Sequence, residues 1–273
     1  MNDEYLKCRE AADYIAERCD CSDAIGLILG TGLGEVGDEI EDPVIIDYSD
    51  IPHFPTPTVH SHKGKLICGR LFDKKVLCMQ GRSHFYEGHD MKTVVRPVRV
   101  MKLLGVKAGI MTNAAGGCNT TYHPGTIMFI EDFINFMGDN PLRGPNIDEF
   151  GPRFPDMTLA IDREYTQLGK KAAEDLGIDV KSGVYMGFRG PSFETPGEIR
   201  FAQTIGADAV GMSFVPEIIT ARHCGLRTIG ISCITNMAAG ISGNELTVEE
   251  VNETVEKVGE DFKKLIKEII RRM

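Results

Sequence analysis

The sequence predicts a single α/β domain, spanning residues 1–273, with a mixed central β-sheet flanked by α-helices. Short apolar runs alternate with helical patterns from residue 75 onward, which is typical of α/β folds. These runs are short and unbroken, as buried parallel strands are, and several stop abruptly in clusters of Gly, Ser, Thr or Asn. No repeat, low-complexity segment or linker interrupts the chain, and its length allows one large core.

The expected elements begin with a helix at about residues 3–18, where apolar side chains recur at helical spacing. Strand-like runs then lie near 24–29, 44–47, 65–71, 75–80, 107–112, 126–130, 182–188, 207–211 and 226–233. Further helical patterns lie near 92–104, 162–176, 196–205, 215–223 and 247–271.

The last helix has a clear beginning, because Thr247 is an N-cap residue with Glu250 at the third helical position. Its apolar stripe consists of Val251, Val255, Val258, Phe262, Leu265, Ile266 and Ile269. Residues 135–158, in contrast, are rich in Pro, Gly and Asn and are expected to be irregular. A loop of this length inside a compact domain is usually functional or interfacial.

Composition excludes several classes of protein. The net charge of −10 argues against general affinity for nucleic acid, where a basic surface is expected. No apolar stretch approaches the roughly 20 residues that a membrane helix needs. The charged, helical N-terminus does not resemble a signal peptide, so a cytoplasmic location is expected.

The eight cysteines point to the same compartment. Cys68, Cys78 and Cys233 sit inside apolar runs, which fits small buried thiols in a reducing cytoplasm. No CxxC pair occurs, so zinc and redox motifs are not supported. The close pair Cys19 and Cys21 follows the first helix and is interpreted as incidental.

Five junctions between an apolar run and a polar cluster are the most informative feature of the chain. They are AIGLIL/GTGLG (24–34), VLCM/QGRSH (76–84), GIM/TNAAGG (109–117), ADAV/GMS (207–213) and TIGISCI/TNMAAG (228–240). Open α/β sheets bind ligands at the carboxyl ends of their strands. Glycine-rich loops there bring backbone N–H groups close to a ligand. Together the junctions predict one composite pocket.

Two familiar motifs are misleading here. Residues 32–37 fit the dinucleotide-binding pattern G-x-G-x-x-G, but only about nine residues separate Gly34 from the strand at 44. A parallel crossover needs at least about 10–12 residues, so a Rossmann unit is not expected. Five histidines lie between 53 and 89, namely His53, His60, His62, His84 and His89. No carboxylate-rich helix or HExxH spacing accompanies them, and neither a metal site nor a G-x-S-x-G nucleophile is predicted.

The junctions together supply the groups of an oxyanion site. Arg82 carries a planar fork that suits phosphate oxygens, and Thr31 and Ser213 add hydroxyls. Along an extended exit from the strand, Arg82, His84 and Tyr86 can share one face. For any single motif, a surface ion pair or a simple turn is the better explanation of the residues. All five together favour a phosphate or phosphate-ester site.

Nine ordered blocks then show a resemblance that runs nearly end to end. The chain resembles purine nucleoside phosphorylases of the trimeric type, in the family that includes methylthioadenosine phosphorylase. The blocks are GTGLG (30–34), HSHKGKL (60–66), QGRSHFYEGH (80–89), TNAAGG (112–117), NPLRGPN (140–146), GPSFETP (190–196), GADAVGMSFVPE (206–217), ARHCGL (221–226) and ITN (234–236). The resemblance implies a partly barrel-like sheet, a cytoplasmic role in purine salvage and a homotrimer.

The resemblance also implies roles for individual residues. Phosphate would be bound by Thr31, Arg82, His84, the Ala114 backbone and Ser213. Tyr86, Met212, Val248 and the nearby His62 would surround the ribose, while Phe193, Glu194 and Asn236 would contact the purine. Phe154 would reach into the site of the neighbouring subunit. His84, Glu194 and Asn236 are the expected catalytic residues, with His84 a phosphate ligand rather than the principal acid or base.

The implied reaction is attack of phosphate on the ribose C1′ as the purine leaves, without a protein nucleophile, metal or cofactor. A carboxylate at Glu194 suits the protonated N1 of hypoxanthine and guanine, and Asn236 can orient its amide toward O6 and N7. The pair favours inosine and guanosine. Glu194 also has a simpler interpretation as an acidic residue at a helix start, just before Pro196.

One position departs from the family pattern. Many members that act on 6-oxopurines carry His near the start of the final helix, where this chain has Val248. An apolar residue there favours a 5′-methylthio group, so 5′-methylthioinosine or 5′-methylthioadenosine is the alternative substrate. A nucleoside hydrolase and a non-enzymatic nucleoside-binding protein are the rival classes. Both leave the phosphate-binding residues poorly explained.

Overall fold

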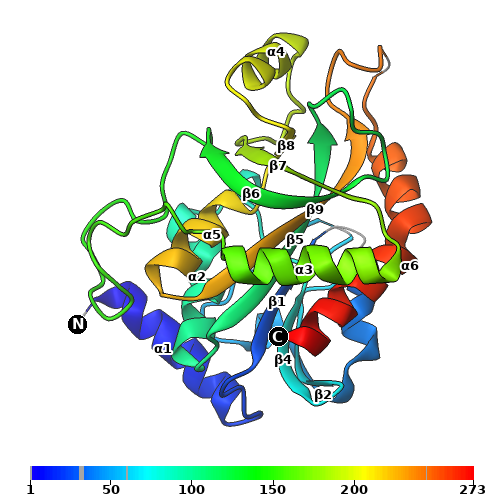
Figure 1. The fold of residues 1–273 in the computed structure, drawn as a ribbon. Helices are drawn as coiled ribbons and strands as arrows, with labels where there is room; N and C mark the ends of the chain where they lie inside the picture. Colours follow the sequence, from blue (N-terminus) through cyan, green and yellow to red (C-terminus); the bar gives the residue numbers. More distant parts are fainter. Residues whose placement is uncertain (1, 31–33, 60, 244) are drawn as a thin grey trace.

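The computed structural model describes residues 2–30, 34–59, 61–243 and 245–273, and it confirms a mixed sheet flanked by helices (Figure 1). Nine strands are hydrogen-bonded in the order β2-β3-β4-β1-β5-β8-β7-β6-β9. Their bounds are β1 Ile25–Leu29, β2 Glu41–Asp47, β3 Lys65–Leu71, β4 Lys74–Gln80, β5 Ala108–Gly117, β6 Ile127–Asn135, β7 Val180–Gly187, β8 Ala209–Gly211 and β9 Arg227–Met237.

Part of the sheet closes on itself, as the barrel-like prediction requires. β5 pairs in parallel with both β1 and β9, and its last residues pair antiparallel with β8. The path then continues from β8 through β7 and β6, and back to β9. Five strands therefore form a closed ring, while β1 and β4 continue the sheet outward to the antiparallel strands β3 and β2.

The described residues after β1, from Gly34 onward, do not form a Rossmann unit. A short 3-10 helix at Gly34–Glu39 leads into β2, which pairs antiparallel with β3 rather than parallel with β1. The glycines at 34 and 37 consequently do not begin a crossover helix.

In the described part of the chain, six α-helices occupy the positions that the sequence predicts: α1 Asp3–Ala16, α2 Met91–Leu103, α3 Arg163–Leu176, α4 Pro196–Thr204, α5 Val215–His223 and α6 Val248–Arg272. Side-chain caps fix several of their beginnings. The Thr247 side chain accepts from the Glu250 N–H, as the sequence indicates for α6. Residues 136–162, between β6 and α3, form a long stretch of turns and bends without a helix or strand.

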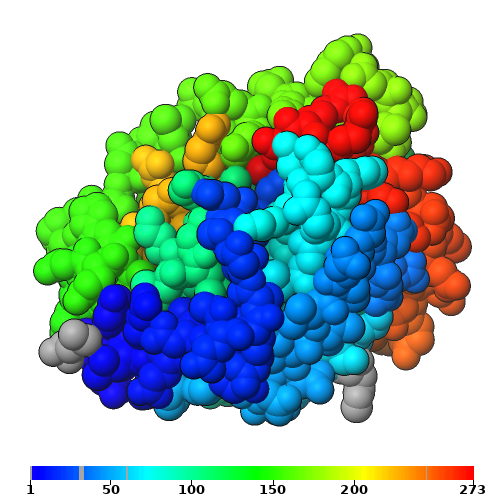
Figure 2. All heavy atoms as spheres, turned by 90° about the horizontal axis from the view of Figure 1, so that it is seen from below, coloured from blue at the N-terminus to red at the C-terminus, as the bar shows by residue number. Residues whose placement is uncertain are grey.

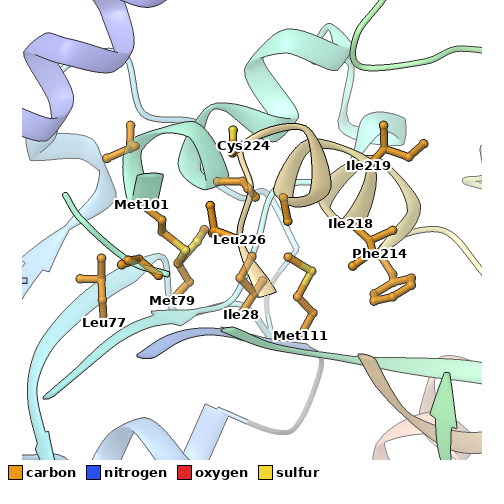
Figure 3. Close-up of a cluster of buried hydrophobic side chains, with 14 of the residues drawn as sticks. Ile28, Leu77, Met79, Met101, Met111, Phe214, Ile218, Ile219, Cys224 and Leu226 are labelled. Atoms are coloured by element: carbon orange, nitrogen blue, oxygen red, sulfur yellow. The ribbon is translucent and has the colours of Figure 1, made fainter. Parts of the chain in front are cut away.

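The helices cover the sheet from two sides and produce two main apolar clusters. α2 and α5 pack their side chains onto β1, β4 and β5, where Met101, Ile218 and Met111 belong to one cluster (Figure 3). α3 and α6 pack on the opposite face, where Phe262 and Leu265 are fully buried against Phe129 and Ile231. Both faces of the central strands are thus buried, whereas the edge strand β2 is largely exposed. The ends of the central strands are left as the place where a ligand can approach.

The view from below shows α1 and the segment around residues 40–75 sharing one surface of the molecule (Figure 2). Within the described ranges, no helix combines the length and the apolar character that crossing a membrane requires.

Candidate active site

The ends of β1, β4, β5, β8 and β9 surround one cavity of about 510 Å³. Every one of the five junctions contributes a described residue to its wall, so the sequence-based prediction of a composite pocket agrees with the geometry. The wall consists of Gly30, Thr58, Val59, Ser61, Arg82, His84, Tyr86, Asn113–Gly116, Pro191, Phe193, Glu194, Val210–Ser213, Thr235, Asn236, Val248, Val251 and Asn252.

Gly30 allows β1 to end directly against β5. Its N–H donates to the Thr112 hydroxyl at 3.0 Å. A Cβ at residue 30 would lie 2.7 Å from the Asn113 Cα and 2.8 Å from the Thr112 carbonyl oxygen, too close for any other residue. The backbone therefore lines the cavity itself at this point. Thr31, which is predicted to bind phosphate, lies outside the described residues.

Arg82 is held rigidly at the cavity wall. Its Nη1 donates to the Glu217 carboxylate at 3.1 Å, and both side chains are almost fully buried. Nη2 donates to the carbonyl oxygens of Ile28 and Thr112. Nε has no hydrogen-bond partner within the described residues, although it is buried. A fixed guanidinium with an unused donor is suited to bind an anion.

Glu217 has no role in the sequence-based prediction, yet it joins Arg82 to the loop after β8. Its carboxylate also accepts from the Phe214 N–H at 2.9 Å. Phe214 has φ +65 and ψ −53, an unusual conformation for a residue other than glycine, and its ring is buried against Tyr185. These contacts fix the preceding residues Met212 and Ser213 in the wall. An acidic residue at the third position of α5, after Pro216, is the signal that indicates this capping role.

His84 is oriented by Glu87, a second residue without a predicted role. The His84 N–H donates to Glu87 at 2.6 Å, and His84 Nδ1 lies 3.0 Å from the same oxygen. Thr58 donates its N–H and its hydroxyl to the other carboxylate oxygen. Burial opposes the charge, but the hydrogen bonds from His84 and Thr58 lower the pKa of Glu87 to about 2. The carboxylate therefore stays ionised and leaves His84 Nε2 as the ring nitrogen available to a ligand.

Of the predicted ribose contacts, Tyr86 and Met212 line the cavity, whereas His62 does not. Tyr86 stacks on His84 with ring centroids 4.7 Å apart and lines the cavity, as Met212 does. The ring centroids of His62 and His84 are 5.0 Å apart, and His62 is absent from the described lining of the cavity. Its Nδ1 is 2.6 Å from the Arg82 carbonyl oxygen and 3.0 Å from the Arg82 nitrogen. Burial lowers the pKa of His62 to about 4, so a neutral ring supports the Arg82 backbone.

Glu194 and Asn236 present polar groups that suit a base. Glu194 is 8% exposed, its Oε1 has no hydrogen-bond partner within the described residues, and burial raises the pKa of its carboxyl group. Asn236 Oδ1 accepts from the Thr235 hydroxyl at 2.9 Å, while Nδ2 donates to the Met237 carbonyl oxygen at 3.2 Å. An amide offers two acceptor and two donor positions, so Asn236 keeps one of each for a ligand. Phe193 adds a partly exposed ring to the same wall.

The beginning of α6 completes the wall. Val248, the first residue of α6, is 58% exposed and lines the cavity together with Val251 and Asn252. The apolar stripe of α6 assigns Val251 to the core, but the structure places it partly buried at the cavity instead. Helical periodicity alone cannot distinguish a core position from a cavity-lining position, because the same apolar face of α6 contributes to the core and to the cavity wall.

Phe154 does not reach the cavity of its own chain. Its side chain is 88% exposed and borders a separate hollow beside Arg153, Leu142 and Ile219. The predicted contact of Phe154 with a neighbouring subunit stays a prediction.

A model of the phosphorylase superfamily matches residues 24–271. The chain is 55% identical over 260 residues to purine nucleoside phosphorylase 1 of Bacillus subtilis, covering 95% of this chain and 96% of the relative. Isoform 2 of purine nucleoside phosphorylase from Schistosoma mansoni, in complex with cytosine and ribose-1-phosphate, has a TM-score of 0.94 and 41% identity, covering 98% of this chain and 97% of that chain. The S. mansoni enzyme in complex with inosine has a TM-score of 0.93 and 38% identity, covering 98% and 96%.

Proposed function

Because the chain belongs to the phosphorylase superfamily and, within it, to the purine nucleoside phosphorylases, we propose that it cleaves inosine and guanosine, and their deoxy forms, with inorganic phosphate. The products are the free base and ribose 1-phosphate or its deoxy analogue. One observation carries the proposal: a single cavity combines the buried guanidinium of Arg82 with the amide of Asn236 and with Glu194, whose Oε1 atom has no hydrogen-bond partner among the described residues.

These groups account for the chemistry. A phosphate oxygen forms a bond to C1′ while the bond from C1′ to N9 breaks, and the electron pair leaves with the purine. In the transition state, positive charge develops on the sugar and negative charge develops on the base. Phosphate held by Arg82, His84 and Ser213 stabilises the sugar cation, and Asn236 stabilises the base as N7 gains a proton from solvent. Every charge is met by substrate or protein, so no cofactor or metal takes part in the proposed reaction.

The test is base release from inosine with and without phosphate. We expect base to appear only when phosphate is present, in equimolar amount with ribose 1-phosphate. Undiminished release in phosphate-free buffer would identify a hydrolase instead. Binding of inosine without turnover in phosphate would identify a nucleoside-binding protein.

The burial of Glu194 predicts a pH-dependent signature. An ionised Glu194 accepts the N1–H of a 6-oxopurine, so kcat/KM for inosine should fall on the acid side as the carboxyl group takes up a proton. Because the pKa of Glu194 is raised in the folded state, folded protein binds more protons than unfolded protein above the ordinary glutamate range. This contribution to stability is present below the unfolded pKa and is lost as the pH rises through the folded pKa.

Glu194→Gln should remove both effects. We expect kcat/KM for inosine to fall about 10- to 100-fold, the value of a hydrogen bond to a charged group. The melting temperature at neutral pH should rise, because no charge is buried. The matched control is Glu198→Gln in the first turn of α4, the helix that follows Glu194, because the exposed side chain at 198 keeps its capping bond to the Thr195 N–H. Equal losses of activity in both variants would contradict the assignment of Glu194.

Substitution of Val248 tests whether 5′-methylthioinosine is the preferred substrate. If the side chain at 248 excludes the 5′-hydroxyl in favour of a methylthio group, Val248→His should shift the ratio of kcat/KM between inosine and 5′-methylthioinosine toward inosine by about 10-fold. Asn252→Ala, one turn along the same wall, is the control for general disturbance of α6. A strong preference for inosine that Val248→His does not alter would refute the methylthio substrate.

We also propose that the enzyme is a cytoplasmic homotrimer in purine salvage. The trimer is supported by family resemblance and by Phe154, which is exposed on the irregular segment 136–162. Phe154→Ala should raise KM for inosine several-fold and leave KM for phosphate nearly unchanged, because the ring would cover the neighbour's base and not its anion. Phe72→Ala removes another exposed ring and should change neither. Full activity and unchanged KM of a dilute monomer would contradict the shared site.

A further inference from the structure

Three thiols, two from one connection and one from a distant strand, meet outside the described lining of the catalytic cavity. Cys19 and Cys21 lie in the connection after α1, and Cys68 lies in β3. The Sγ atoms of Cys19 and Cys21 are 3.5 Å apart, and those of Cys21 and Cys68 are 3.4 Å apart. All three sulfurs lie within 4.8 Å of one another. Figure 2 shows the N-terminal segment beside the strands that follow residue 40.

These separations suit a shared metal ion. Zn²⁺ binds thiolate sulfur at about 2.3 Å, which puts two sulfurs of a tetrahedral site roughly 3.8 Å apart. The observed separations are close to this spacing, so small side-chain rotations would place all three around one ion. A cavity of about 220 Å³ borders Cys19 and Cys21, and it leaves space for water as a fourth ligand.

The remaining cysteines offer no such site. Cys8, Cys78, Cys118, Cys224 and Cys233 are buried, and none belongs to a group of three His, Cys, Asp or Glu ligands among the described residues. Burial raises the pKa of Cys8 to about 12, so it stays a neutral thiol. Thiophilic binding is thereby expected at a single place in the described chain.

We propose that Cys19, Cys21 and Cys68 form a structural site for a soft d¹⁰ cation, with Zn²⁺ as the expected ion. Each thiol loses its proton as its sulfur binds the ion, and the proton goes to solvent. The ion would fasten the connection between α1 and β1 to β3, one of the outer strands of the sheet. The three cysteines are absent from the described lining of the catalytic cavity, so the ion stabilises the fold without joining the reaction. No local motif indicates this site, because Cys68 lies 47 residues beyond Cys21 in the sequence.

The experiment is equilibrium dialysis of the reduced full-length protein against Zn²⁺, with metal content measured by mass spectrometry. We expect one Zn²⁺ per chain and a higher melting temperature with Zn²⁺ than with a chelator. Cys19→Ser and Cys68→Ser should each weaken binding at least 100-fold and abolish the thermal shift. Cys8→Ser, a buried thiol on α1, is the matched control and should bind normally. Co²⁺ should give thiolate charge-transfer absorption that the two site variants lack.

Phosphorolysis should be unchanged in Cys19→Ser, the partly buried position, which shows that the variant folds. The proposal is overturned if the reduced protein binds no Zn²⁺, or if binding survives in both site variants. It is also overturned if Cys8→Ser loses binding equally. Isolation of a Cys21–Cys68 disulfide from protein that binds no Zn²⁺ after reduction would identify a redox pair instead.

Discussion

Replacing Asn236 with alanine should lower kcat for inosine about 10²- to 10³-fold, the effect of removing one preorganised donor or acceptor from a developing charge. The amide is almost fully buried, and its bonds to Thr235 and Met237 fix its orientation before any ligand arrives. Its free positions engage the base most strongly when N7 becomes protonated. KM should therefore change much less than kcat. Single-turnover measurement of base release, at saturating phosphate, gives the comparison.

Asn236→Asp is the informative partner of this variant. It keeps the shape of the side chain and the oxygen that faces Thr235, but exchanges the amide donor for a second acceptor. A 6-oxo group then meets a carboxylate, so inosine should remain poor, while 6-amino nucleosides should recover part of the lost rate. If Asn236→Ala raises KM and leaves kcat unaltered, Asn236 binds the ground state and is not part of the transition-state stabilisation.

Local patterns in the sequence predicted the elements well because the determinants are local. The run IGLIL forms β1 and is buried at every position, and Thr247 caps α6 through the predicted contact with Glu250. The strand-end clusters located the cavity for a related reason. Parallel strands direct their carboxyl ends to a common edge, so polar residues that end such strands meet there in space.

The supporting residues were not predictable in this way. Glu217 and Glu87 orient Arg82 and His84 through contacts that depend on tertiary placement, and an acidic residue at a helix start has a sufficient local explanation. Closure of the ring through β5 and β9 also has no local signature, because strand pairing is a long-range property. The cysteine cluster was not predictable for the same reason. In the sequence Cys68 is an ordinary apolar-run residue, and only the tertiary structure brings β3 beside the residues that follow α1.

The cavity thus contains two kinds of polar group. Arg82 and His84 are paired with buried carboxylates, whereas the Glu194 Oε1 atom is buried without a hydrogen-bond partner among the described residues. A side chain that is paired in this way is fixed before phosphate arrives, so it needs little rearrangement during the reaction. The buried Oε1 atom carries a desolvation penalty, which a donor on the ligand relieves. The first arrangement favours rate, and the second favours selection of a base with N1–H.

The Arg82–Glu217 pair allows structure and function to be separated by a double variant. Arg82→Met should lower the free energy of unfolding by about 3–5 kcal/mol, because the Glu217 carboxylate stays buried without its partner. The same variant should raise KM for phosphate by roughly 10- to 150-fold through loss of a charged hydrogen bond. Thermal or denaturant unfolding and phosphate titration measure the two effects independently.

Adding Glu217→Gln to Arg82→Met removes the stranded charge and keeps an oxygen for the Phe214 N–H. The double variant should regain most of the free energy of unfolding that Arg82→Met loses, since uncharged buried groups replace an unpaired ion. KM for phosphate should stay high, because the guanidinium is still missing. If the double variant regained both stability and phosphate affinity, Arg82 would serve only to neutralise Glu217, and phosphate would have to be held by His84, Ser213 and the backbone around Ala114. Stability restored without phosphate affinity would instead place the guanidinium in contact with the anion.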